Sequence, residues 1–251
     1  MQRYKITIAY DGAPYSGFQR QINGVTVQGL IEEALTPLNP SFVPIAAASR
    51  TDAGVHALGQ VAHFDLEISR NPETVQKALN ARLPRDIRII KTELASPNFH
   101  ARFDAKKKLY TYTISTAPFQ SPFERFHALH FPYPLNLHAI DESIKKLKGT
   151  HDFTPFANTN PKPYPTNPVR TLFDISYTIS PTTGGDTLVF TFFGDGFLYN
   201  MIRNLIGILL DAGQKRISPD EIEAYLHKKT TKRSFTTMPA HALCLKEVFY
   251  E

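Results

Sequence analysis

A polar stretch in the first half of the chain contains the residue types of a catalytic site. Residues 48–57 read ASRTDAGVHA. Asp52 supplies a carboxylate, Arg50 lies two positions away and can hold it ionised, and Gly54 permits a positive φ or a close ligand approach. Asp and Gly are equally typical of a polar turn, and a histidine beside a turn, such as His56, more often makes a structural hydrogen bond. Spacing alone therefore leaves a catalytic loop and a simple turn both open.

Further polar and aromatic motifs are spread along the chain. They read YDG at 10–12, YSGFQRQ at 15–21, TVQ at 26–28, FHARF at 99–103, KLYTY at 108–112, HDF at 151–153, VRT at 169–171 and FLYNMIRNLIG at 197–207. Together with ASRTDAGVHA they resemble the motifs of the bacterial TruA family of tRNA pseudouridine synthases. Many members carry Trp where Phe18 stands, and an AGPAGL-like run near the family's C-terminus is replaced here by SFTTMPAHAL at 234–243. The resemblance runs from the first predicted strand to the last.

The resemblance assigns roles to particular residues. It implies that Asp52 is the catalytic carboxylate, that Tyr110 contacts the target base, and that Arg203 accompanies the catalytic aspartate. By the same resemblance, the substrate is the anticodon arm of tRNA at positions 38–40, and the protein works as a homodimer. From the sequence alone, a tyrosine in an alternating strand, such as Tyr110, is more often a core residue whose hydroxyl is hydrogen-bonded.

Pseudouridine formation fits a chain that offers one such aspartate and no cofactor motif. The reaction breaks the N-glycosidic bond of uridine and rejoins uracil to the sugar through carbon, so it needs no oxidant, metal or energy donor. An ionised carboxylate beside the sugar carbon can add covalently, assist elimination or stabilise positive charge. Arg203 and Arg50 are expected to keep Asp52 ionised and to bind the substrate. We therefore expect no cofactor and no metal.

An RNA substrate also requires contacts to the phosphate backbone and to an extruded base. The target base must leave its stack, and Tyr110 is the predicted stacking residue. The formal net charge of +5 permits a polyanionic partner without requiring one. Basic residues near the motifs are the expected backbone contacts: Arg20, Arg102, Lys106, Lys107 and Lys108. The lysine run is also typical of an exposed, solvated surface.

The hydrophobic pattern predicts an α+β fold. Strands are expected at 4–10, 43–48, 60–66, 87–94, 109–115, 169–179, 187–193 and 243–250, and helices at 27–35, 72–83, 138–147, 197–212 and 219–227. This order predicts two fused ferredoxin-like βαββαβ units with mostly antiparallel sheets and a cleft between them. The expected domains are residues 1–104, which carry the Asp52 loop, and residues 105–251, which carry an extra helix.

Composition favours a cytoplasmic protein. Cys244 is the only cysteine, so neither a disulfide framework nor a thiolate metal site can form. The N-terminus lacks the apolar segment of a secretory signal, and the longest apolar stretch, at 205–210, is too short to span a membrane.

Two other functions are compatible with the pattern. Tandem βαββαβ units also occur in RNA-binding modules that stack bases on sheet aromatics and need no Asp52. A nucleoside hydrolase could use Asp52, but it would normally require a second carboxylate as acid or base. The sequence shows no convincing second carboxylate beside Asp52.

Overall fold

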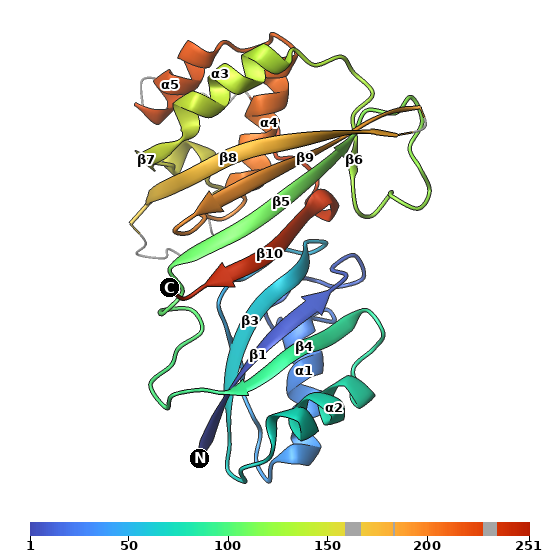
Figure 1. Ribbon diagram of the computed structural model, residues 1–251, viewed down its shortest axis with the longest axis vertical. Helices are drawn as coiled ribbons and strands as arrows, with labels where there is room; N and C mark the ends of the chain where they lie inside the picture. The colour runs from blue at the N-terminus through green and yellow to red at the C-terminus, as the bar shows by residue number, and fades with distance from the viewer. Residues whose placement is uncertain (159–166, 183, 228–234) are drawn as a thin grey trace. The chain divides into compact units, whose positions relative to one another are not determined.

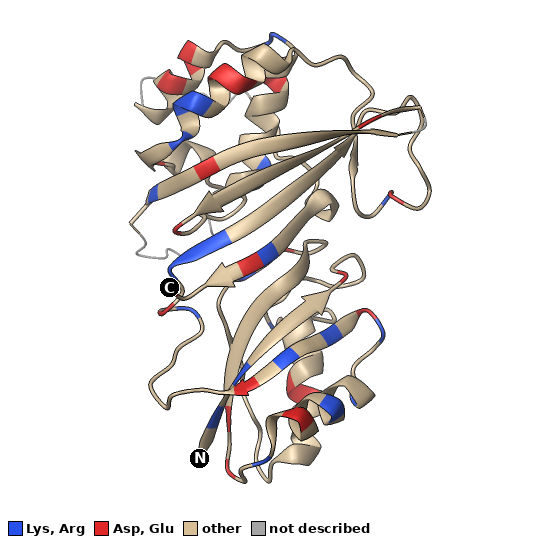
Figure 2. Ribbon diagram, viewed as in Figure 1, with Lys and Arg blue, Asp and Glu red and all other residues tan. Residues whose placement is uncertain are grey.

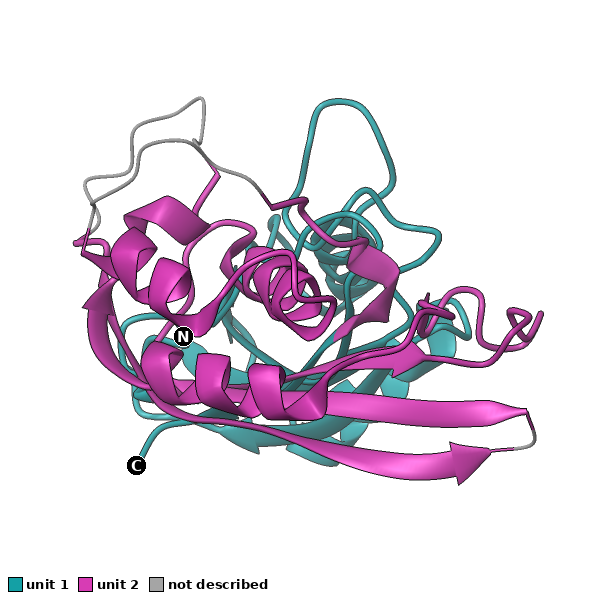
Figure 3. Cartoon of the chain, turned by 90° about the horizontal axis from the view of Figure 1, so that it is seen from above, with its two compact units in different colours: residues 1–106, 244–251 teal, residues 107–243 magenta. Residues whose placement is uncertain are grey.

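The chain forms two compact units. The computed structural model describes residues 1–158, 167–182, 184–227 and 235–251 (Figure 1). Unit 1 comprises Met1–Lys106 and Cys244–Glu251, and unit 2 comprises Lys107–Leu243 (Figure 3). The C-terminal residues therefore belong to the unit that is built mainly from the beginning of the chain.

Unit 1 combines a mostly antiparallel sheet with two α-helices. Its elements are β1 (Gln2–Tyr10), α1 (Val27–Leu35), a 3₁₀ turn (Thr36–Leu38), β2 (Ala46–Ala47), β3 (His56–Leu66), α2 (Pro72–Arg82), β4 (Ile87–Leu94) and β10 (Leu243–Phe249). The strand order is β4-β1-β3-β10. β1 is antiparallel to β3 and β4, whereas β10 is parallel to β3 and pairs at its N-terminal end, opposite His56 and Ala57. The two-residue strand β2 pairs further along β3.

Local sequence explains why these elements form. In β1 the side chains of Tyr4, Ile6, Ile8 and Tyr10 are buried and alternate with partly exposed residues, which is the pattern of a strand with one face on a core. Thr26 caps α1 by accepting from Gly29 N. Helix α2 contacts both α1 and β4, so the helices cover the apolar face of the sheet.

Unit 2 repeats the combination of sheet and helices. Its elements are β5 (Lys107–Ser115), β6 (Leu129–His130), α3 (Leu137–Leu147), β7 (Gly149–Asp152), β8 (Val169–Thr182), β9 (Gly185–Gly194), α4 (Met201–Gly213), α5 (Pro219–Leu226) and 3₁₀ turns at Thr154–Phe156 and Ala240–Ala242. The antiparallel order is β5-β9-β8-β7, and β6 adds a short parallel pairing on β5. Helix α3 packs against α4, α5 and β8.

The predicted fold class, α+β with mostly antiparallel strands, is confirmed, and its assignment to ferredoxin-like units stays a prediction. The strand expected at 43–48 is only two residues long. The helix expected from residue 197 begins at Met201, because Asn200 adopts a left-handed backbone with φ 59°. In the described part of the chain, no helix combines the length and apolarity that crossing a bilayer requires.

An ion pair across two strands of unit 1 links the sheet to the loop after β4. Arg3 in β1 lies opposite Asp65 in β3, and its Nε and a terminal nitrogen donate to the two carboxylate oxygens at 2.8 and 2.7 Å. Another terminal nitrogen donates to Phe99 O at 2.9 Å. The hydrogen bond to Arg3 holds the pKa of Asp65 below its ordinary value, although partial burial opposes the shift.

We predict that this pair makes the protein acid-sensitive. Because the folded-state pKa of Asp65 is depressed, its contribution is complete above the unfolded pKa of about 4 and is lost as pH falls through the folded value. Asp65→Asn should cost about 1 kcal/mol at pH 7, after allowance for solvent screening, and much less at pH 3. Urea unfolding at pH 7, 5 and 3 measures the difference. Glu73→Gln, which changes an exposed carboxylate in α2, is the control, and an equal pH dependence in both variants would contradict the assignment.

Candidate active site

The Asp52 loop, residues 48–55, connects β2 to β3, and buried residues on either side of Asp52 hold it in place. Thr51 and Val55 are buried, whereas Asp52 between them is partly exposed. Val55 N donates to Asp52 O at 3.1 Å, closing a turn in which Gly54 has the positive φ of 82° that the sequence allowed. Asp52 is therefore neither sealed in the core nor fully exposed to solvent.

The loop after β1 packs directly against the Asp52 loop. Phe18 N donates to Thr51 O at 3.0 Å, and the hydroxyls of Tyr10 and Thr51 are 2.7 Å apart. A Cβ on Gly12 would collide with the carbonyl of Val55, and one on Gly17, which has φ +100°, would lie 2.9 Å from Thr51 O. The motifs at 10–18 and 48–57 therefore form one structural piece, in which glycine permits backbone-to-backbone contact.

Two buried polar side chains fix the ends of the Asp52 loop. Gln60, fully buried in β3, donates to Ser49 O at 2.8 Å and accepts from Ser49 N at 3.2 Å. Nδ1 of His56 lies 3.0 Å from Gly12 N and 3.1 Å from an Asp11 carboxylate oxygen. His56 has the structural hydrogen bond that its place beside a turn suggested.

Arg50 is affected by the charge of a second arginine of unit 1. Its side chain is exposed, and its pKa is lowered, first by partial burial of the guanidinium and then by the positive charge of Arg102. A bound anion, such as a phosphate, would relieve the repulsion between the two guanidinium groups.

Arg20 takes part in a partly buried polar cluster. Its guanidinium lies 2.9 Å from a carboxylate oxygen of Glu32 in α1, and Glu32 is only 2% exposed. The other oxygen of Glu32 accepts from Gln28 Nε2 at 2.8 Å and Ile45 N at 3.1 Å. The guanidinium also lies 5.1 Å from the ring centre of Phe42. These contacts give Arg20 a structural role, whatever it does toward RNA.

The three lysines predicted to contact RNA have different surroundings. Lys106 is exposed, and its backbone N donates to Phe249 O at 2.8 Å. Lys107 and Lys108 begin β5, whose first residues are basic (Figure 2). The ammonium of Lys107 lies 6.0 Å from the ring centre of Phe173. Lys108 is partly exposed opposite Gly194.

Tyr110 lies in the middle of β5 and is largely covered. It pairs with Phe192 of β9, is 6% exposed, and packs edge-to-face with Phe197 at 5.2 Å between ring centres. The structure thus gives Tyr110 the packed environment that a strand tyrosine usually has. Any base that it contacts would meet a small part of its surface.

Arg203 lies in the first turn of α4 and is hydrogen-bonded to the loop that contains Met238. Its Nε donates to Met238 O at 2.6 Å, a terminal nitrogen donates to Asn200 Oδ1 at 2.8 Å, and its own carbonyl accepts from Met238 N at 3.2 Å. The Arg203 guanidinium is partly buried in an otherwise apolar helix, so it needs hydrogen-bond partners, and these bonds supply them.

Two further residues of α4 hold the same loop and were missed by sequence reasoning. Asn204, fully buried, donates to Phe156 O at 2.7 Å and accepts from the Thr237 hydroxyl at 2.7 Å. A Cβ on Gly207 would collide with Thr236 O. Two features of the sequence could have indicated this contact: a polar residue in an apolar helix, and a glycine about one turn after it.

Comparisons with known proteins identify the class to which this fold and site belong. A family model described as tRNA pseudouridine synthase matches residues 6–104 and 143–251. The chain is 42% identical over 252 residues to tRNA pseudouridine synthase A of Streptococcus pneumoniae (strain 70585), and 44% identical over 254 residues to that of Streptococcus equi subsp. equi (strain 4047). Both matches cover 100% of this chain and of the relative. Among solved structures, the chain is similar to one in a Cbf5-Nop10-Gar1 complex. The TM-score is 0.41 and the sequence identity 12%, and the match covers 98% of this chain and 48% of that chain.

The chain belongs to the tRNA pseudouridine synthase family. This family is one of isomerases, so the predicted family and enzyme class are confirmed.

We predict that Gly12→Ala disturbs the Asp52 loop. The added methyl group must displace the Val55 carbonyl, so unfolding should become easier by roughly 2 to 3 kcal/mol, which is typical of overpacking. Gly184→Ala is the matched control, because its φ is +105° but nothing lies within 4 Å of the added Cβ, so it should cost only about 1 kcal/mol. Thermal unfolding compares the two, and equal losses would contradict the close contact.

We predict that Asn204→Ala releases the loop that follows residue 235. The substitution leaves the Phe156 carbonyl and the Thr237 hydroxyl without their buried partner, at a cost of about 2 to 3 kcal/mol. Hydrogen exchange should show faster exchange at the Met238 amide, which donates to Arg203 O. Asn98→Ala, at an exposed site, should leave that amide unchanged. Unaltered exchange in Asn204→Ala would show that the loop is held by other contacts.

Proposed function

We propose that this protein converts uridine to pseudouridine at positions 38–40 in the anticodon arm of tRNA, with Asp52 as the catalytic nucleophile. The single observation that carries the proposal is that full-length relatives called tRNA pseudouridine synthase A match the entire chain. The partly exposed carboxylate on an anchored loop is consistent with it.

The proposed chemistry balances without any added reagent. The bond between N1 of uracil and C1′ of the ribose breaks, the base turns, and a bond forms between C5 and C1′. The proton on C5 is lost and a proton is gained at N1, so the product is an isomer of the substrate. Asp52 would attack, assist elimination at, or stabilise the positive sugar carbon. No cofactor or metal is required by this scheme.

Three other motif residues would prepare the carboxylate and hold the substrate. The positive charge of Arg50, two residues from Asp52, favours an ionised carboxylate. Arg203 is proposed to bind the substrate while its Nε and a terminal nitrogen hold the loop at Met238 and the side chain of Asn200. Tyr110 stays the proposed contact for the target base, and its 6% exposure limits that contact to a small area.

The remaining assignments are parts of the same proposal. Backbone phosphates would contact Arg102, Lys106, Lys107 and Lys108, and Arg20 would join them while paired with Glu32. We further infer a domain boundary after residue 104, a homodimer and a cytoplasmic location. The expected second domain, 105–251, differs from unit 2, because Cys244–Glu251 belong to unit 1. Sedimentation at several protein concentrations tests the dimer.

The decisive experiment follows the C5 proton. tRNA carrying tritium at uridine C5 is incubated with the wild-type protein, Asp52→Ala and Asp52→Asn. We expect tritium release by the wild type and release slower by roughly 10³-fold or more in both variants, because neither has a nucleophilic carboxylate. Both should keep tRNA affinity within about threefold, since the partly exposed carboxylate contributes little to phosphate contacts.

Other outcomes distinguish the competing functions. tRNA binding without tritium release by the wild type would favour a non-catalytic RNA-binding module. Release of free uracil would favour a nucleoside hydrolase. Retention of release in tRNA lacking uridine at positions 38–40 would contradict the proposed target positions.

A further inference from the structure

A tight turn after β4 presents an exposed aromatic ring next to an arginine side chain. The turn comprises residues 99–104, which read FHARFD. The Phe103 side chain is 73% exposed, an unusual exposure for a large apolar residue. The guanidinium of Arg102 lies 5.8 Å from its ring centre.

Internal hydrogen bonds hold this turn in one conformation. His100 N donates to a carboxylate oxygen of Asp104 at 2.8 Å, and Asp104 N donates to His100 O at 3.0 Å. Nδ1 of His100 accepts from Arg102 N at 3.1 Å and from Phe103 N at 3.3 Å. The His100 ring lies 4.2 Å from the Phe103 ring at 31°, so it covers one side of Phe103.

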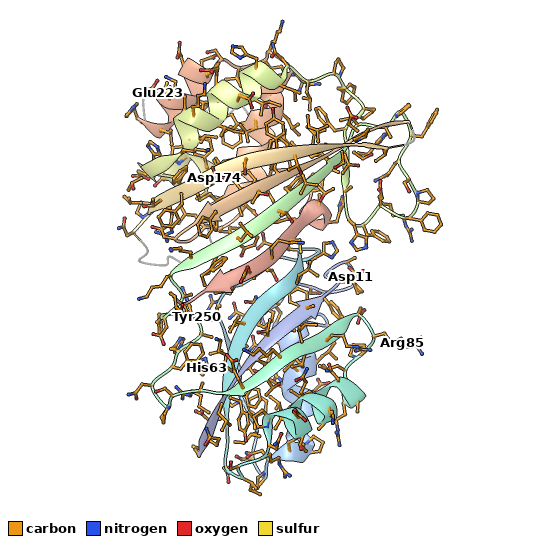
Figure 4. The ribbon with its side chains drawn as sticks, in the orientation of Figure 1. Asp11, His63, Arg85, Asp174, Glu223 and Tyr250 are labelled. Atoms are coloured by element: carbon orange, nitrogen blue, oxygen red, sulfur yellow. The ribbon has the colours of Figure 1, made fainter. Side chains whose placement is uncertain are left out.

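The rest of unit 1 anchors the turn at its buried residue. Ala101 is fully buried, its N donates to Nδ1 of His63 at 3.1 Å, and its carbonyl accepts from the Tyr250 hydroxyl at 2.8 Å (both side chains are labelled in Figure 4). Burial, and then the nearby His100, lower the pKa of His63, which keeps Nδ1 available as an acceptor. Arg3 holds the carbonyl of Phe99.

A ring that is rigid, exposed and close to a guanidinium group has the properties of a nucleobase-stacking platform. Every base has a π-face, and stacking on an aromatic side chain contributes substantially to RNA affinity. An ordered platform loses little conformational entropy on binding, whereas a mobile aromatic would lose more. The Arg102 guanidinium near the ring suits the phosphate that accompanies each base.

We propose that Phe103, backed by His100, stacks on an unpaired nucleobase of the RNA substrate while Arg102 contacts the adjacent phosphate. The proposal rests on the proposed function insofar as the ligand is tRNA. It assigns Phe103 to substrate binding and not to the chemical step. Uniform binding of this kind lowers KM and leaves kcat unchanged.

Substitutions at residue 103 separate stacking from simple apolar contact. Phe103→Ala should weaken tRNA binding and raise KM about 5- to 100-fold with kcat unchanged, and Phe103→Leu should behave like Ala because it lacks a π-face. Phe103→Tyr should remain within about twofold of wild type. Phe123→Ala, which removes a ring that is 89% exposed in unit 2, is the matched control and should have no effect.

Salt dependence distinguishes the roles of the neighbouring residues. In a plot of log Kd against log salt concentration, Phe103→Ala should keep the wild-type slope, since no phosphate contact is lost. Arg102→Ala should reduce the slope by about one.

The chain has no tryptophan, so Phe103→Trp introduces a single fluorescent reporter. Its emission should be quenched by tRNA, whereas that of Phe123→Trp should not. This result would support the stacking contact even if the wild type released no tritium, an outcome that would contradict only the proposed function.

Three results would each overturn the inference. The first is unchanged tRNA binding by Phe103→Ala, and the second is full activity of Phe103→Leu. The third is an emission change in the Phe103→Trp variant when protein concentration is raised without RNA, because it would indicate contact between copies of the chain.

Discussion

The position of the proposed catalytic carboxylate depends on close backbone contact between two loops of unit 1. Gly12 and Gly17 allow the loop after β1 to lie directly on residues 51–55, and the bond from Phe18 N to Thr51 O fixes their register. A side chain at Gly12 would collide with the Val55 carbonyl, and one at Gly17 would lie close to Thr51 O in a backbone conformation that favours glycine. Catalytic groups lose efficiency when displaced by about 1 Å, so under the proposed function this contact would matter for catalysis as well as for packing.

The same loops are tied to α1 through a buried carboxylate. Glu32 accepts from Ile45 N, in the segment that leads to the Asp52 loop, and pairs with Arg20, in the loop after β1. A buried charge is costly unless it is paired and hydrogen-bonded, and Glu32 meets both conditions. The Glu32 side chain of α1 therefore holds both the loop after β1 and the segment that leads to the Asp52 loop. This explains why a charged residue stands on the otherwise apolar buried side of α1.

Sequence patterns predicted elements well and predicted contacts poorly. Alternation placed β4 at its observed bounds, and capping residues placed the start of α1, because both signals are local. The partners of Arg20 and Arg203 could not be found in this way, since Glu32 and Met238 are brought to them by tertiary structure. The start of α4 was placed four residues early because its apolar pattern gives no sign of the left-handed Asn200.

The modest net charge limits how this protein can hold a polyanion. A formal charge of +5 comes from 28 basic and 23 acidic residues, and several of the basic ones are occupied by carboxylates within the fold, as Arg3, Lys5 and Lys146 are. Cations paired in this way are less available to neutralise phosphates, and phosphate neutralisation is the main source of affinity in non-specific RNA binding. Affinity for a tRNA must accordingly draw on contacts that do not depend on net charge. Rigid exposed aromatic rings beside local guanidinium groups supply such contacts, and they also discriminate between an unpaired base and a regular helix, whose bases are already stacked on one another.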